Sequence, residues 1–492
     1  MQMRSRRENG YLTVYLSLVF AIILSLLLAL VEGAAMGAAR LQAELVADLG
    51  IDSVFAEYHR ELFSQYGLLF IDDSYGTSKG SISKIEKHLT DYMSYNMNPK
   101  KGILIPPGSN WIGLESSYLE IEEAAFATDD NGAVWKAQAI DYMMSRYGMD
   151  IIKGIQEQLQ TVEEKQLLSR DLKQELTDYK ASFENALKTE EIEETNQKTK
   201  EGFSYDTIID FLDGFSGKGI LHLTVSEQES LSSAIMNRQE YVSYRAEQGN
   251  SNQGCGLPEY IETPEGLINE LIFDEFLLEK YGFYGKEKEG SHLQYQIEYI
   301  LSGRDNDISN LRECVERLFM LRSVSNYLYL TTVDTVKYKE AHVISMAISA
   351  LLCLPEIEEV LTQIIVVIWS MAEAVVDVRN LLDGGKVPLI KAKGEWELGL
   401  TSMLHGGLQT DKNMTQTSGL SYKEYLRILL GVMINQKDKA MRSMDIAEMD
   451  IRKTAGNENF RIDQCVDYLK VTFGFTGDRG QEYVFTRTMR YE

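Results

Sequence analysis

Residues Tyr11 to Val31 read YLTVYLSLVFAIILSLLLALV and contain no charged side chain. As an α-helix this stretch is about 31 Å long at about 1.5 Å per residue, which matches the hydrocarbon core of a bilayer. We therefore predict a transmembrane helix over residues 11–31, and this helix decides how the rest of the chain is interpreted.

The charges on either side of this stretch predict its orientation. Residues 1–10, which end at Gly10, include the basic side chains of Arg4, Arg6 and Arg7, whereas acidic and basic residues are mixed after the apolar stretch. The positive-inside rule therefore places residues 1–10 in the cytoplasm as a short leader and everything after Val31 outside it. We expect a single-pass protein of the cell membrane with an extracytoplasmic body over residues 67–492.

A cleaved secretory signal is the competing interpretation, because the small residues GAAMGAA follow the apolar stretch and resemble a processing site. The apolar run is longer than a signal sequence needs, and a helical spacing of apolar residues continues after it. We therefore favour an uncleaved anchor that continues into an amphipathic stalk helix over residues 32–66. Gly50–Ile51–Asp52 is the expected kink or cap within that stalk.

Small residues follow the apolar stretch at a spacing that allows another helix to approach. Gly33 and Gly37 form a GxxxG motif, with Ala34 and Ala38 beside them. This pattern predicts a helix-packing surface at the outer membrane boundary. The alternative is a loosely packed turn next to the membrane, because motifs of this size often occur by chance.

Composition restricts the fold and the partners. The chain has 492 residues, 44% of them apolar, and its 49 basic and 74 acidic residues give a net charge of −25, which disfavours a nucleic-acid partner. Seven prolines among many helix-forming residues favour long helices. We predict a helix-rich α+β protein with a helical bundle and a mainly antiparallel sheet. The four cysteines form no CxxC pair, so they predict no metal site, and their disulfide pairing stays open.

The spacing of apolar residues predicts the first elements of the body. A short strand, LLFIDD, follows Gly67, and a strand around Leu119 and Ile121 precedes a turn and a helix over 133–147. One long helix and an acidic turn are expected over residues 151–202. Ile220–Val225 and the alternating stretch Leu293–Leu301 are both predicted to be strands.

The spacing of apolar residues in the second half of the chain predicts a helical bundle over residues 303–453, followed by a C-terminal β-hairpin over 460–492. The apolar stretch IIVVIWSMAEAVV within the bundle is too short to cross a membrane, so we expect a buried core helix there. The expected bundle helices cover residues 308–333, 336–352, 357–382 and 421–453.

Candidate chemistry is weak throughout. Ser81 and Lys84 match the SxxK pattern of serine acyl enzymes, but no KTG box follows. Asp305, Asp307, Ser309 and Glu316 fit part of a calcium-loop template, although a helix N-cap at Asp307 or Ser309 explains them more simply. The segment Asp213–Gly219 lacks phosphate-loop spacing, and the six histidines lack metal-ligand spacing. We expect no catalytic residue, no metal and no cofactor.

The opening RRENGYLTVYLSLVFAIILSLLLALVEGAAMGAARLQAELVADLGIDSVFAEYHRELFSQYGLLF resembles the N-terminus of TadE/TadG-like pseudopilins of tight-adherence pilus systems. The resemblance covers about the first 70 residues. It implies a minor pseudopilin or pilus-assembly component that works by helix packing. Processing after Gly10 would normally be accompanied by a glutamate five residues on, and Tyr15 stands there, so a static, TadG-like anchor fits better than a fibre subunit.

These observations predict a non-enzymatic bacterial cell-envelope protein. Its expected partners are the membrane, envelope or pilus-system proteins, and a second copy of the chain bound through the N-terminal helix. The alternative is an extracytoplasmic binding or sensing module tethered by a single helix.

Overall fold

The computed structural model describes residues 8–97, 113–147, 153–189, 219–225, 230–252, 254–256, 266–404, 408, 418–432, 436–478 and 480–491. The protein is a helix-rich α+β protein with a small antiparallel sheet. Its contacts divide the chain into two compact units. Unit 1 comprises Met1–Gln138, Ser251–Ile261 and Thr454–Glu492, and unit 2 comprises Ala139–Asn250 and Glu262–Lys453.

Unit 1 begins with the long helix α1 (Glu8–Phe55), which is 48 residues long. The predicted kink at Gly50–Asp52 is wrong, because the helix continues without a break to Phe55. Gly50 is buried, and a β-carbon there would lie 3.4 Å from the side chain of Met93, so the glycine allows close packing on the next long helix instead of a bend.

The predicted stalk is two helices. A short helix α2 (Arg60–Tyr66) follows α1, and the His59 side chain caps its start by accepting the backbone N–H of Leu62 at 3.2 Å. Gly67 ends α2 in the left-handed conformation.

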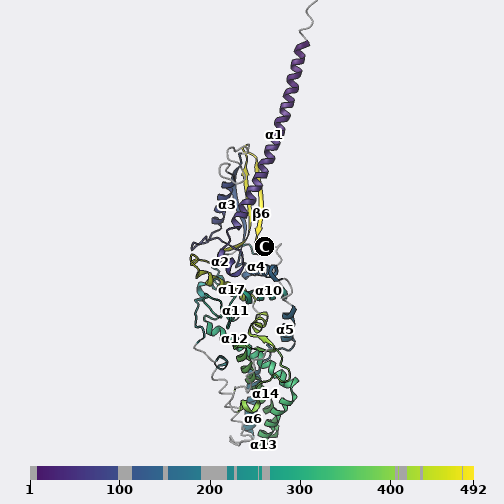
Figure 1. Cartoon of the computed structure of the whole chain (residues 1–492), viewed down its shortest axis with the longest axis vertical. Helices are drawn as coiled ribbons and strands as arrows, with labels where there is room; N and C mark the ends of the chain where they lie inside the picture. Colours follow the sequence, from purple (N-terminus) through teal and green to yellow (C-terminus); the bar gives the residue numbers. More distant parts are fainter. Residues whose placement is uncertain are drawn as a thin grey trace, which may run out of the picture. The chain divides into compact units, whose positions relative to one another are not determined.

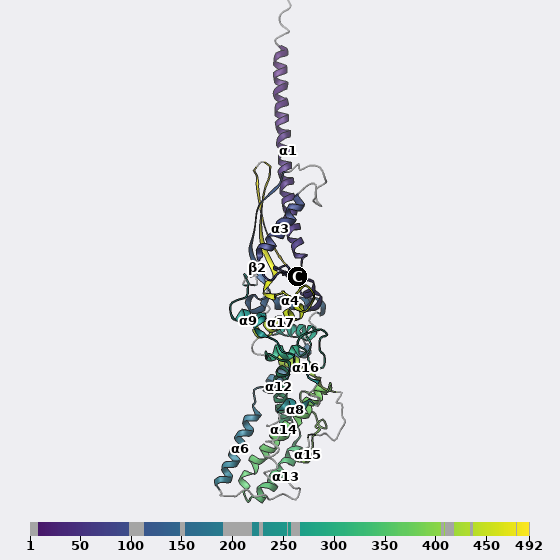
Figure 2. The same ribbon diagram turned by 90° about the vertical axis from the view of Figure 1, so that its left-hand side faces the viewer.

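The sheet of unit 1 brings the two ends of the chain together. Strand β5 (Cys465–Thr476) lies in the middle and pairs antiparallel with β1 (Ile71–Asp72), β2 (Glu115–Phe126) and β6 (Glu482–Arg490). The predicted strands at LLFIDD and around Leu119, and the C-terminal hairpin, are thereby confirmed. Figures 1 and 2 show helix α3 (Ile82–Met97) and these strands beside the C-terminal part of α1.

One face of this sheet and the two helices α1 and α3 enclose the core of unit 1. The buried apolar side chains come from elements far apart in the sequence, so burial of their surface drives the packing. The core includes Val46, Ile51, Val54, Phe55, Ile85, Leu89, Met93, Leu469, Val471, Phe473 and Phe475.

Unit 2 contains most of the remaining helices, and α4 (Asp129–Tyr147) runs from unit 1 into it. Residues 130–132 of α4 have positive φ angles, so the regular helix begins where the sequence predicts it, after the DDNG turn. The further elements are α5 (Lys153–Glu164), α6 (Leu172–Thr189), α8 (Ile220–Thr224), α9 (Val242–Glu247), α10 (Leu267–Lys280), α11 (Gln296–Ser302), α12 (Asp307–Leu328), a π-helix (Tyr329–Val333), α13 (Thr335–Leu351), α14 (Glu358–Leu382), β3 (Lys386–Val387), α15 (Leu400–Leu404), β4 (Leu420–Ser421), α16 (Tyr422–Gly431) and α17 (Gln436–Arg452).

The bundle helices were predicted well. Helices α12, α13 and α14 occupy the three expected ranges, and residues 421–453 form α16 and α17. Nineteen residues of α14 are buried, which confirms that its apolar stretch is a core helix. Helices α12 and α13 both pack against α14.

Three predictions within unit 2 are wrong. The expected strand Leu293–Leu301 is mostly helix α11, and the expected strand Ile220–Val225 is the short helix α8. The expected long helix over 151–187 is two helices, α5 and α6, because Gln166 takes a positive φ of 51° and Asp171 caps the new start at the N–H groups of residues 173 and 174. This break follows the gap in the apolar pattern after Val162.

Candidate functional site

The N-terminal part of α1 presents a largely exposed apolar surface. Almost every side chain from Tyr11 to Ala38 is exposed, although most of them are large and apolar. Exposure of this much contiguous apolar surface to water is unfavourable, so such a surface normally meets lipid or another protein. By length and composition α1 is a candidate membrane span.

The predicted helix-packing residues lie together on this exposed part of α1. A β-carbon added at Gly33 or Gly37 would meet nothing within 4 Å, and Ala34 and Ala38 are also exposed. At the four-residue spacing of the two glycines, this face continues to Leu41 and Leu45, which are 58% and 42% exposed. The small-residue face is therefore open to a partner helix and extends beyond residue 31.

The leader residues are only partly described. Gly10 lies near the start of α1, whereas Arg4, Arg6 and Arg7 lie outside the described residues. The predicted role of these arginines in membrane topology therefore stays a prediction.

The other half of α1 is held firmly in unit 1. Its residues Ala43, Val46 and Ala47 are fully buried, whereas Leu41 and Leu45 on the same turns are exposed. Two hydrogen bonds also fix the orientation of α1 in unit 1. The carboxylate of Asp48 accepts the Nε–H of Arg487 at 2.6 Å, and the Tyr491 hydroxyl donates to the backbone oxygen of Phe55 at 2.5 Å. The exposed and buried parts are one continuous helix.

A cluster of polar side chains fixes the loop after α1 to α3. The carboxylate of Glu57 accepts hydrogen bonds from the Tyr75 hydroxyl at 2.9 Å and the Tyr92 hydroxyl at 2.6 Å, and it lies 3.0 Å from His88 Nδ1. The rings of Tyr75 and His88 are stacked with their centroids 4.1 Å apart. These contacts connect the segment after α1 to α3 and hold the end of α1 in place.

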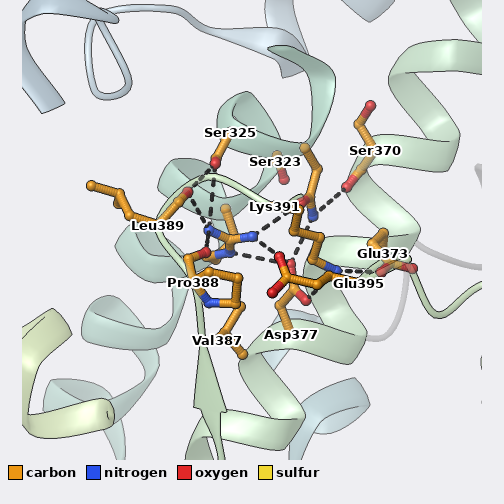
Figure 3. Close-up of polar contacts among 12 residues, drawn as sticks. Ser323, Ser325, Ser370, Glu373, Asp377, Val387, Pro388, Leu389, Lys391 and Glu395 are labelled. Carbon is orange, nitrogen blue, oxygen red and sulfur yellow. Dashed lines mark hydrogen bonds and ion pairs between the residues drawn. The ribbon is translucent and has the colours of Figure 1, made fainter. Parts of the chain in front are cut away.

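Unit 2 contains a buried network of ion pairs, shown in Figure 3. The Arg322 guanidinium on α12 donates through Nε and Nη2 to Asp377 on α14 at 3.1 and 3.0 Å. The Lys391 ammonium bonds the other oxygen of Asp377 at 2.7 Å and also contacts Glu373. All four side chains are almost completely buried.

The remaining donors and acceptors of this network are largely satisfied. Arg322 Nη1 donates to the backbone oxygens of Pro388 and Leu389, at 2.9 and 2.8 Å. The Glu373 carboxylate accepts the backbone N–H groups of residues 397 and 398, both at 2.8 Å. Burial alone would raise the pKa of Asp377, but the nearby ammonium of Lys391 and guanidinium of Arg322 outweigh burial and lower that pKa. Two cations and two anions therefore balance in a saturated cluster, which joins α12, α14 and the segment 386–398.

This network was not predicted from the sequence. The signal was the pair Glu373 and Asp377, one helical turn apart within an otherwise apolar helix. Carboxylates at such positions are almost always paired when buried, so they predict a cation from elsewhere in the chain. The sequence does not show which cation.

Ser81 and Lys84 of the SxxK pattern make separate sets of hydrogen bonds. The ammonium of Lys84 donates to the backbone oxygens of Ser74 and Lys79 and to the Thr77 hydroxyl, whereas the Ser81 hydroxyl accepts the N–H of Ser83. The two residues of the SxxK pattern therefore serve separate structural contacts.

The calcium-loop template is also occupied by structural contacts. Asp307 is buried and accepts hydrogen bonds from the Ser232 hydroxyl at 2.6 Å and from the N–H of Gln294 at 2.9 Å. The predicted N-cap at Asp307 or Ser309 is wrong, because Asn306 caps α12 by accepting the N–H of Ser309 at 2.8 Å. Within the described ranges, no three His, Cys, Asp or Glu side chains are grouped so that they could hold a metal ion.

All four cysteines are free thiols. Cys255 and Cys353 are exposed, whereas Cys314 and Cys465 are buried. The segment Asp213–Gly219 lies outside the described residues except for Gly219.

A cleft of about 1160 Å³ opens in unit 2 between α6, α12 and α17. Three of its basic residues, Arg304, Arg317 and Arg442, are engaged with carboxylates of the same cleft. The Glu313 carboxylate accepts from Arg304 and Arg317, each at 2.7 Å, and Asp438 accepts from Arg442 at 3.0 Å. The cleft is large enough for a small ligand, but its paired charges define no ligand class.

The fold and the exposed half of α1 define a helix-rich α+β protein with one exposed candidate membrane span. The chain belongs to a family of unknown function, DUF5702, whose profile matches residues 198–477. The matched residues exclude α1 and the stretch that resembles TadE/TadG-like pseudopilins. No curated protein and no solved structure matches the chain.

Proposed function

We propose that this protein is a non-enzymatic, membrane-anchored cell-envelope protein that works by helix packing and protein docking, as a TadG-like minor pseudopilin or pilus-assembly component. The observation that carries the proposal is the division of α1 into two halves. One half is exposed and apolar over a bilayer's thickness, and the other is packed into unit 1.

The continuity of α1 supports a mechanical role for the anchor. A helix without a break transmits the position of a membrane partner directly to unit 1, because no flexible linker separates the span from the sheet. The three leader arginines support the orientation with the leader in the cytoplasm and both units outside it.

The open face at Gly33 and Gly37 supports the choice of helix packing as the mode of action. Small residues let two helix backbones approach closely, and the same face carries exposed Leu41 and Leu45 beyond the expected span. We propose that this face binds a helix of another envelope or pilus-system protein, or α1 of a second copy.

Crosslinking tests this proposal. We expect Gly33→Cys and Gly37→Cys variants in membranes to give covalent dimers or adducts with a pilus-system partner, at least several-fold more than Ala35→Cys. Ala35 is exposed on the same turns but lies about 160–200° around the helix from the two glycines. Equal crosslinking from all three positions, or recovery of monomer alone without a pilus-system partner, would contradict the proposal.

A tethered binding or sensing module is the second candidate, and the cleft in unit 2 is the observation that favours it. In that case a small ligand would raise the midpoint of thermal unfolding. An Arg312→Ala change in the cleft lining would reduce this shift, because it removes a cation from the site.

A further inference from the structure

The loop between β1 and α3, residues 73–81, is folded around the ammonium group of Lys84. This group donates to the backbone oxygens of Ser74 at 2.9 Å and Lys79 at 2.8 Å and to the Thr77 hydroxyl at 2.6 Å. The backbone N–H of Ser81 closes the loop by donating to the oxygen of Asp73 at 3.4 Å. The loop leads directly into α3, which packs against α1.

Two acceptor groups without hydrogen-bond partners lie under this loop. Asp73 is only 1% exposed, and neither of its carboxyl oxygens has a partner among the described residues. Gln464 is 5% exposed, and its Oε1 also has no partner there. A β-carbon on Gly80 would lie 1.9 Å from Asp73 Oδ1 and 2.9 Å from Gln464 Cδ, so the two groups converge beneath Gly80.

An ionised carboxylate in this position is costly, because buried acceptors without donors lose their hydration without compensation. A single proton on Asp73 removes the buried charge and supplies a donor for Gln464 Oε1, since a neutral carboxyl has one O–H group that this oxygen can accept. The backbone already holds them in register, because the N–H of Asp73 donates to the oxygen of Gln464 at 2.9 Å.

The charges around Asp73 favour the same proton. Burial is the largest influence, the carboxylates of Asp72 on β1 and Asp463 beside β5 also oppose ionisation, and the ammonium of Lys84 on α3 only partly offsets them. Together they raise the pKa of Asp73 to about 7.

We propose that Asp73 and Gln464 form a proton-dependent latch, in which the protonated Asp73 carboxyl donates to Gln464 Oε1 and keeps the 73–81 loop closed. Loss of the proton leaves two buried acceptors facing each other and favours opening. The latch controls the start of α3 and is independent of the function proposed above, because it depends only on contacts within unit 1.

The direction of the pH effect follows from proton binding. In the open loop Asp73 is hydrated and ionises near its usual pKa of 3.8, whereas in the closed loop it holds its proton up to about pH 7. Between pH 3.8 and about pH 7, the closed loop therefore binds one more proton than the open loop. Its stability is greatest at low pH, falls as the pH rises through this window, and levels off above about pH 7.

Hydrogen exchange of the loop amides in the full-length protein tests the latch. The N–H groups of Gly76, Thr77 and Ser81 are hydrogen-bonded within the loop, so their exchange reports opening. After correction for intrinsic exchange rates, we expect the opening constant to rise about tenfold per pH unit between about pH 5 and 7, and little above that range.

Two variants and one control make the test specific. Asp73→Asn should abolish this pH dependence and keep the opening constant low, because the amide N–H₂ replaces the carboxyl O–H as donor. Gln464→Met should increase opening more at pH 5 than at pH 8, since only the protonated carboxyl uses the acceptor. Asp91→Asn, on the exposed side of α3, should keep the wild-type profile. An opening constant that is flat from pH 5 to 8 in the wild type, or unchanged pH dependence in Asp73→Asn, would overturn the latch.

Discussion

Replacement of Arg322 by methionine is expected to lower the free energy of unfolding of unit 2 by about 3–5 kcal/mol. The guanidinium is fully buried and pairs with Asp377, so its removal leaves that carboxylate with only Lys391 to balance two buried anions. Methionine retains much of the side-chain volume. The loss therefore reports the uncompensated charge and the lost hydrogen bonds rather than a cavity.

Chemical denaturation of the full-length protein in detergent, followed by tryptophan fluorescence, measures this change. Trp369 and Trp396 lie within the same region, and their rings are 5.3 Å apart. Arg312→Met is the matched control, because Arg312 is exposed on the same helix and should change the free energy of unfolding by less than about 0.5 kcal/mol. Similar midpoints for Arg322→Met and the wild type would show that the network contributes little.

The second large effect is expected from charges placed in the exposed half of α1. The double change Ile22→Arg and Leu26→Arg puts two cations on one face near the middle of the predicted span. At about 2.5–3.5 kcal/mol for each arginine, membrane insertion becomes about 5–7 kcal/mol less favourable. We expect most of the variant protein to leave the membrane fraction or to be degraded.

Alkaline extraction of membranes followed by detection of the full-length chain measures this partition. Leu41→Arg with Leu45→Arg is the control, since it places the same two charges at the same spacing on exposed positions of α1 outside the predicted span. This control should remain in the membrane pellet. If the Ile22/Leu26 variant is retained equally well, α1 does not insert as a span.

The parts of the fold that the sequence predicted correctly are those whose pattern of apolar side chains lies within a single segment. The continuous apolar run of α1 and the regular spacing of apolar side chains in the C-terminal hairpin and the bundle helices each lie within one segment of the sequence. Gly33 and Gly37 lie on the exposed part of this helix, and their role in helix packing stays a prediction.

The wrong strand prediction at α11 shows what the spacing of apolar residues does not reveal. Residues 293–301 alternate between apolar and polar side chains, yet Gln296 and Glu298 are also fully buried. Gln296 accepts the N–H of Gly282 at 2.8 Å, and Glu298 accepts the Tyr422 hydroxyl at 2.7 Å. Both polar residues depend on partners distant in the sequence, so the pattern does not reveal that they are internal.

The same limit applies to the buried network and the latch. Arg322, Asp377 and Lys391 come from three segments, and the contact beneath Gly80 joins residues almost 400 positions apart. A single sequence indicates that such polar residues need partners, but only the folded arrangement shows which partners they have.

Thiol labelling tests the proposed membrane topology, in which the anchor leaves both units outside the cytoplasm. In a Cys255→Ser background, Cys353 is the one exposed thiol of the chain, and the buried Cys314 and Cys465 provide an internal control for folding. A membrane-impermeant maleimide should label Cys353 in intact cells, or in spheroplasts where an outer membrane intervenes, to the same extent as after detergent treatment. Labelling only after the membrane is dissolved would place Cys353 in the cytoplasm and contradict the account.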